Sequence, residues 1–107
     1  MKEIRELLLS GTIVAVQETH WTEADAAVWG SLFPGSQVFA SPATRGPRGG
    51  PQGGVALLIP HPWVARQVRE VLPGRYLEVD VTQGSEPDAL QLTVGSLYAP
   101  PMTELLP

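Results

Sequence analysis

The run V-Q-E-T-H at residues 16–20 places the carboxylate of Glu18 directly after a short apolar segment. If that segment is a buried strand, its C-terminal end delivers Glu18 into the crevice where open α/β folds bind ligands. A carboxylate there suits Mg²⁺, which binds one or two carboxylates and keeps several water molecules. An exposed strand-end glutamate, or one that caps the next helix, explains the same residue without chemistry. Residue type alone favours this second explanation.

Other polar groups are weaker candidates for chemistry. Arg45 and Arg48 lie in a segment rich in Gly and Pro, where Arg suits bidentate phosphate contacts. The acidic net charge of the chain instead favours a solvated flexible loop for them. The glycines of this region are not followed by Gly-Lys-Ser/Thr, which excludes a P-loop. His61 stands between two prolines and is typical of a turn.

Composition limits the classes of function. The 107 residues suit one small domain or a piece of a larger one, and the charge balance is 7 − 11 = −4. An acidic chain lacks the basic footprint of a protein that holds nucleic acid by charge alone. A nucleic-acid function would therefore rest on a metal or on residues supplied elsewhere. The absence of cysteine excludes disulfides, thiolate zinc sites and cysteine nucleophiles.

The same sequence predicts neither a membrane segment nor a secretory leader. No apolar run approaches the roughly 20 residues needed to span a bilayer. The first six residues are mostly charged, unlike a signal peptide. We expect an intracellular location, in the nucleus or cytoplasm, rather than secretion, and no membrane partner.

Hydrophobic periodicity in the first half predicts a helix, a strand and a second helix. Residues 2–10 have helical spacing, and residues 12–17 form a β-branched run that is apolar on both faces. Such a run is typical of a central strand covered on both sides. Thr22 is the expected N-cap of a helix ending near residues 33–35. Its expected apolar face consists of Ala24, Ala27, Val28 and Leu32.

The second half predicts strands joined by turns. Residues 42–52 have no apolar periodicity and should form an exposed, mobile loop. Residues 75–81 and 90–98 alternate in polarity and should pair as a hairpin across a turn at 84–88, closed by residues 99–101. The remaining expected strands are residues 37–41 and 55–59. Residues 63–72 fit either a strand or a helix, and we favour a strand. The order of elements favours an α/β architecture in one domain.

Three segments, residues 14–20 (VAVQETH), 53–59 (GGVALLI) and 97–100 (LYAP), resemble the endonuclease/exonuclease/phosphatase superfamily in order and separation. This superfamily includes abasic-site endonucleases and the endonuclease domains of non-LTR retrotransposons. The retroelement branch is the more similar, because its members also have segments that look like "QETH", "GVAIL" and "YAP", in that order. The resemblance covers most of residues 12–101.

The resemblance implies roles for four residues. Glu18 matches the metal-binding glutamate, so that the implied cofactor is Mg²⁺ or Mn²⁺, held weakly by this chain. Tyr98 matches a tyrosine near the substrate phosphate, and His20 occupies a position where relatives place a polar or basic residue near the site. These two are the candidate catalytic residues. Gln17 matches a glutamine that orients the metal ligand. Without the resemblance, Tyr98 is an aromatic that covers the sheet at a hairpin end.

The resemblance also implies an incomplete domain. The family fold is a deoxyribonuclease-I-like four-layer α/β sandwich, with two β-sheets flanked by helices, and residues 1–107 match only part of it. A first strand bearing an Asn, and C-terminal Gly-Asp-x-Asn and Ser-Asp-His motifs, are not in this sequence. We therefore expect a fragment that is inactive or nearly so alone, with exposed strand edges and the missing remainder as a partner.

The implied function is Mg²⁺-dependent phosphodiester hydrolysis, with DNA as the ancestral substrate and partner. A phosphatase acting on an inositol lipid or another small phosphoester remains open, as does a non-catalytic interaction module. An unrelated small α/β domain with three accidental matches is the remaining alternative.

Overall fold

The computed structural model describes residues 2–85 and 87–99, which form two helices and eight strands. The elements are α1 (Lys2–Leu9), β1 (Val14–Gln17), α2 (Glu23–Leu32), β2 (Ser36–Ser41), β3 (Thr44–Arg45), β4 (Pro51–Gln52), β5 (Val55–Pro60), β6 (Val64–Leu72), β7 (Tyr76–Gln83) and β8 (Leu90–Leu97). The described strands make three antiparallel sheets, in the orders β1-β5-β2, β3-β4 and β6-β7-β8. The predicted mixture of α and β structure is confirmed. Neither helix in these ranges is long and apolar enough to cross a membrane.

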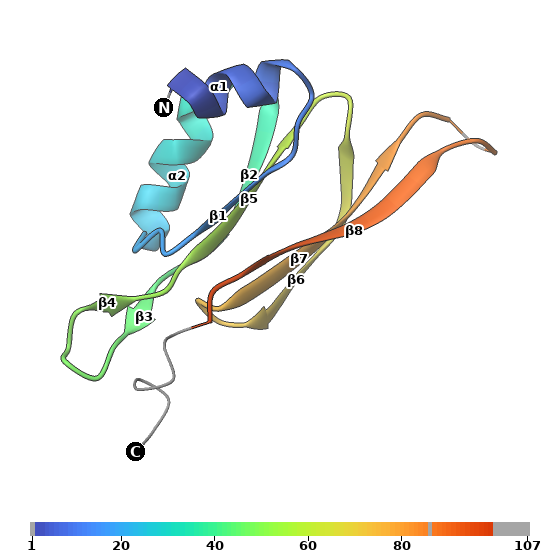
Figure 1. The fold of residues 1–107 in the computed structure, drawn as a ribbon. Coiled ribbons are helices and arrows are strands. Elements are labelled where there is room, and N and C mark those ends of the chain that lie inside the picture. The colour runs from blue at the N-terminus through green and yellow to red at the C-terminus, as the bar shows by residue number, and fades with distance from the viewer. Residues whose placement is uncertain (1, 86, 100–107) are drawn as a thin grey trace.

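The two larger sheets and the helices are stacked in layers (Figure 1). Both helices lie on one face of the β1-β5-β2 sheet, and the β6-β7-β8 sheet lies on the other. Side chains alternate along β5, so every second one points to the opposite layer. The layer between the sheets is filled by Val55, Leu57, Ile59, Leu77, Val79 and Val81. The layer beneath the helices contains Leu8, Trp21, Phe33, Ala56 and Leu58.

Helix α2 begins and ends where the sequence predicts but buries a different face. The Thr22 hydroxyl accepts from the Asp25 backbone N–H at 3.2 Å, and the Asp25 carboxylate accepts from the Thr22 N–H at 2.9 Å. This reciprocal capping box satisfies two N–H groups that have no partner within the helix. The predicted apolar face is wrong, because its four members are exposed.

Aromatic side chains determine which face of α2 packs inward. The ring centroids of Trp21 and Trp29 are 4.6 Å apart, and those of Trp29 and Phe33 are 5.8 Å apart. Residues 29 and 33 are one helical turn apart and therefore lie on the same face. Large aromatic rings bury more apolar area than alanines, so the helix turns this face to the sheet.

The central strand of the first sheet is β5 rather than β1. All six residues of β5 are buried. The strand has a neighbour on each side, since Leu57 pairs with Ala15 of β1 and with Phe39 of β2. Strand β1 alternates between half-buried and exposed residues and is an edge within the described chain. The prediction of a central strand at residues 12–17 is therefore wrong: β1 pairs with β5 alone and its Ala15 is exposed, although Ile13 packs against the layer between the sheets and Val14 and Val16 against the layer beneath the helices.

Most second-half predictions are confirmed. Strands occur at the predicted segments 37–41, 55–59 and 63–72, and β7 pairs with β8 as the predicted hairpin. The segment 42–52 is not without structure, because it contains the short β3-β4 hairpin. Residue 86 of the predicted turn and Pro100 and Pro101 of the predicted end lie outside the described residues.

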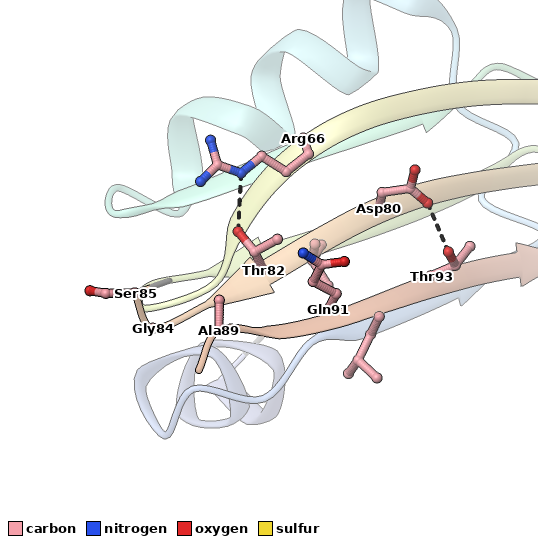
Figure 2. Close-up of a pocket in the computed structure, with 10 residues that line it drawn as sticks. Arg66, Asp80, Thr82, Gly84, Ser85, Ala89, Gln91 and Thr93 are labelled. Carbon is pink, nitrogen blue, oxygen red and sulfur yellow. Dashed lines mark hydrogen bonds between the residues drawn. The ribbon is translucent and has the colours of Figure 1, made fainter. Parts of the chain in front are cut away.

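A polar network covers the outer face of the β6-β7-β8 sheet. Arg69 donates to Glu78 at 2.9 Å and binds both carboxylate oxygens of Asp80 at 2.7 and 2.8 Å. The Tyr76 hydroxyl donates to Glu78 at 2.6 Å, and the Thr93 hydroxyl donates to Asp80 at 2.8 Å, as Figure 2 shows for the second pair. The Arg69 and Thr93 hydrogen bonds lower the pKa of Asp80 to about 2. Those from Tyr76 and Arg69 lower the pKa of Glu78.

Replacing Arg69 should return the pKa of Asp80 towards its ordinary value near 3.8. A folded-state pKa that is depressed contributes stability above the unfolded pKa, and this contribution is lost as pH falls through about 2. We expect Arg69→Met to raise the pKa of Asp80 and reduce the loss of stability between about pH 4 and pH 2, as measured by carboxyl NMR titration. Arg66→Met is the matched control, because the Arg66 Nε donates to Thr82 instead. An Asp80 titration unchanged in Arg69→Met would contradict the assignment.

Candidate functional site

Three segments that are far apart in the sequence meet at one end of the sandwich. The residues after β1 run beside the residues before β5, where the Thr19 N–H donates to the Gly54 carbonyl and the His20 N–H to the Gly53 carbonyl, both at 3.1 Å. The residue after β8, Tyr98, places its ring against Gly53, with Cδ2 3.1 Å from where a Cβ on that glycine would lie. The site therefore assembles the segments carrying Glu18, Gly53-Gly54 and Tyr98.

Glycine is required at both positions before β5. Gly53 and Gly54 have φ values of +74° and +89°, which side-chain-bearing residues rarely adopt. A Cβ on Gly54 would collide with the Thr19 hydroxyl oxygen, and one on Gly53 would lie 2.5 Å from the Gly74 carbonyl oxygen. The absence of side chains therefore lets three backbone segments approach each other closely.

Glu18 and His20 adopt left-handed backbone conformations, with φ of 52° and 56°. This conformation costs roughly 1–2 kcal/mol for residues other than Gly, Asn or Asp. Hydrogen bonds hold the intervening turn: the Trp21 N–H donates to the Thr19 hydroxyl at 3.2 Å, and the Ala43 N–H donates to the Trp21 carbonyl at 2.9 Å. Both Glu18 and His20 are exposed. A strained turn that presents exposed polar side chains is a common feature of functional sites.

Tyr98 is fixed from the side of the second sheet. Its N–H donates to the Arg75 carbonyl at 2.7 Å, and its half-buried ring packs against the core between the sheets. The ring therefore covers the end of the sheet, as expected for a hairpin-end aromatic. That position also lies beside the segment that holds the Glu18 turn, so the two explanations of Tyr98 are compatible.

The turn between β6 and β7 contacts the site, although no predicted site residue lies in it. The Gly74 carbonyl accepts from the Gly54 N–H at 2.7 Å, and the Gly74 N–H donates to the Ser41 hydroxyl at 2.6 Å. The Ser41 hydroxyl in turn donates to the Glu70 carboxylate at 2.7 Å. The Pro73-Gly74 pair was the available signal, since this dipeptide marks a tight turn. The sequence could not indicate that the turn would reach β5.

Gln17, predicted to orient the metal ligand, bonds across the two sheets. Its side-chain Nε2 donates to the Ser96 hydroxyl at 3.0 Å, and that hydroxyl donates to the Val16 carbonyl at 2.9 Å. Ser96 is 1% exposed. Ser96 was not among the predicted site residues, although alternation from Leu92 and Val94 places residue 96 on the same inner face.

Glu18 fits the requirements of one Mg²⁺ ligand, because it is an exposed carboxylate at a strand end. Within residues 2–85 and 87–99, no three His, Asp or Glu side chains gather as a metal-ligating group. Arg45 and Arg48 are exposed on the β3-β4 hairpin. The site as described can therefore supply one carboxylate, an imidazole and a tyrosine to a ligand.

A separate surface hollow of about 760 Å³ lies at the far end of β8, beside the β7-β8 turn (Figure 2). Its lining includes Arg66, Thr82 and Gln91. The lining reaches Thr93 of β8, so residues 94–97, at about 3.3 Å per residue, separate the hollow from Tyr98. The hollow and the Glu18 turn are therefore distinct places on the molecule.

Comparisons with protein-family models, with curated proteins and with solved structures find no match to this chain.

Close approach at Gly54 generates a stability prediction. We expect Gly54→Ala to lower the free energy of unfolding by about 3 kcal/mol or more, because it adds a left-handed alanine and an atomic overlap. Gly30→Ala is the matched control, since Gly30 is helical and a Cβ there meets nothing within 4 Å. It should stabilise by roughly 0.5–1 kcal/mol. Urea denaturation measures both, and a loss below about 1 kcal/mol for Gly54→Ala would refute the packing argument.

Backbone strain at Glu18 generates a second prediction. Asparagine tolerates the left-handed region, so Glu18→Asn should raise the free energy of unfolding by about 1 kcal/mol. Glu18→Gln removes the same charge without relieving the backbone and should stay within about 0.5 kcal/mol of the parent chain. Chemical denaturation of the three proteins separates strain from charge. Equal stabilities for the Asn and Gln variants would show that strain at Glu18 is negligible.

Proposed function

We propose that this chain is part of a Mg²⁺- or Mn²⁺-dependent phosphodiesterase domain of the endonuclease/exonuclease/phosphatase type, with DNA as substrate. Glu18 is the proposed metal ligand, Tyr98 the residue that contacts the substrate phosphate, and His20 a polar group near the reacting centre. We assign it to the branch found in non-LTR retrotransposons, because the three motif segments resemble that branch most.

The observation that carries the proposal is the convergence of those segments. Similarity of short runs in a sequence does not require them to be neighbours in space. Here the Glu18 turn is hydrogen-bonded to Gly53 and Gly54 at 3.1 Å, and the Tyr98 ring packs against Gly53. An active site needs groups from several segments at one place, and this arrangement meets that need.

Conformational strain is the second support. Glu18 adopts φ of 52° although nothing in a solvent-exposed glutamate requires that conformation. Strained residues persist when the surrounding structure holds them, and they cluster at functional sites. An exposed carboxylate with an ordinary backbone conformation at this strand end would not point to a functional site.

The proposed parent architecture is the deoxyribonuclease-I-like four-layer sandwich. The layering of helices, sheet and second sheet in the described chain is compatible with three of its layers. In this proposal the further groups that hold the metal and activate water come from segments with Asn, Gly-Asp-x-Asn and Ser-Asp-His motifs. When bound, the metal would neutralise charge on the phosphate, and an Asp-His pair from those segments would position the attacking water. The chain supplies one metal ligand and the Tyr98 contact.

Paramagnetic Mn²⁺ gives a direct test that does not need catalysis. We expect Mn²⁺ to broaden the backbone amide resonances of residues 18–20 before those elsewhere, because the ion binds the Glu18 carboxylate. Glu18→Gln should abolish this selective broadening. The control is Glu23→Gln, which changes the first turn of the adjacent helix α2 and should leave the effect intact.

The outcomes separate the alternatives. Broadening that is equal in the parent chain and in Glu18→Gln would exclude Glu18 as a ligand and favour a non-catalytic module. We expect little or no Mg²⁺-dependent nicking of plasmid DNA by the chain alone, because one carboxylate holds Mg²⁺ weakly. If a small or lipid phosphoester, but not DNA, perturbs the Tyr98 ring resonances in the presence of Mn²⁺, the phosphatase assignment replaces the nuclease one.

A further inference from the structure

Ser96 is an unusual residue for the interior of the sandwich. It lies on the inner face of β8, and of the described polar and charged residues only Ser96 and Ser41 are buried. Its inner-face neighbours along the strand are the aliphatic residues Leu92 and Val94. A buried hydroxyl is costly unless it is hydrogen-bonded, so its bonds at this position require an explanation.

The bonds of Ser96 join strands that do not pair with each other. Strand β8 belongs to the second sheet, and β1 is an edge of the first. The hydroxyl accepts from Gln17 Nε2 at 3.0 Å and donates to the Val16 carbonyl at 2.9 Å, across 79 and 80 residues of sequence. Apolar packing between sheets is not directional, whereas two hydrogen bonds with defined geometry fix one strand relative to the other.

The position of this link along both strands is significant. Gln17 directly precedes Glu18, and Ser96 stands two residues before Tyr98. The Glu18 turn is also bonded to Gly53 and Gly54, and Gly54 in turn bonds Gly74 of the β6-β7 turn, while the Tyr98 backbone is bonded to Arg75 of the second sheet. That route passes through two loops, whereas the Ser96 hydroxyl bonds β1 itself. Among the described residues, it is the direct hydrogen-bonded connection between the strand end bearing Glu18 and the strand end bearing Tyr98.

We propose that Ser96 is a positioning residue: through Gln17 and the Val16 carbonyl, its hydroxyl sets the location of the Glu18 turn relative to Tyr98. The assignment rests on the proposed function for the importance of that spacing. Ser96 contacts neither metal nor substrate in this scheme. Misplacement of about 1 Å at a reacting group can cost a hundredfold in rate. A residue that sets the distance between Glu18 and Tyr98 therefore has a large effect on the rate.

Amide hydrogen exchange tests the positioning without metal. Ser96→Ala removes both bonds, and loss of about one net hydrogen bond should speed exchange of the Thr19 and His20 amides roughly tenfold. The Ala26 amide, bonded to the Thr22 carbonyl in α2, should be nearly unaffected. Ser31→Ala is the matched control, because its hydroxyl bonds only the Val28 carbonyl of its own helix. A purely structural serine would speed exchange equally at Thr19, His20 and Ala26, and that result would overturn the proposal.

Bound Mn²⁺ tests the consequence for the site. Paramagnetic relaxation falls with the sixth power of distance, so the broadening of the Tyr98 ring by an ion at Glu18 reports their separation. In Ser96→Ala we expect this ring broadening to change by about twofold or more, for a displacement on the scale of about 1 Å, while that of residues 18–20 persists. Ser96→Thr keeps the hydroxyl and should restore the parent values. Unchanged ring broadening in Ser96→Ala would overturn the inference.

Two further results keep the tests separable. Should Ser96→Ala fail to fold, Gln17→Leu removes one of the two bonds at an exposed side chain and leaves the bond to the Val16 carbonyl. It should speed exchange at Thr19 and His20 relative to Ala26, by a smaller factor, and equal rates at all three amides would overturn the proposal. Absence of selective Mn²⁺ broadening at residues 18–20 in the parent chain counts against the proposed function. The exchange measurement decides the positioning role in that case, because it depends only on hydrogen bonds within the protein.

Discussion

The burial of strand β5 on both faces is the constraint on which the rest of the structure depends. Its odd-numbered side chains fill the layer between the sheets, and its even-numbered ones fill the layer beneath the helices. Each layer removes apolar surface from water, which is the dominant favourable contribution to folding. Because β5 also pairs with β1 and β2, it fixes the positions of both neighbours and, through them, of the two helices.

The start of β5 transmits that constraint to the candidate site. Gly53 and Gly54 occupy a space that cannot hold a side chain, so that Thr19, Gly74 and Tyr98 approach from three directions. The Glu18 turn takes a strained conformation while its neighbours Thr19 and His20 are hydrogen-bonded to the two glycines that lead into the fully buried β5. Rigid support and local strain therefore have one source, which suits a site that presents a carboxylate from a fixed position.

Among the residues that the structure describes, the clustered charged side chains on the outer face of the second sheet are paired with one another, whereas those on the Glu18 turn are not. On the outer face of the second sheet, Arg69 engages both Glu78 and Asp80, so the charges of this cluster are largely matched to one another. Such a self-satisfied network leaves little capacity to recognise an external ion. Beyond the C-terminal end of β8, near Tyr98, Glu18 and His20 are exposed on their turn. Within the described part of the chain, the Glu18 carboxylate has no ion-pair partner, in contrast to Glu78 and Asp80.

The sequence by itself determined the local elements and the chemistry of individual residues. Alternation predicted the hairpin of residues 75–81 and 90–98, and Thr22 marked the start of α2, because both depend on neighbours within a few residues. Only the tertiary structure decided that β5 rather than β1 is central, that Trp29 and Phe33 turn α2 inward, and that Ser96 meets Gln17. Those features depend on packing between segments up to 80 residues apart, and no local pattern encodes which long-range contact buries the most apolar surface.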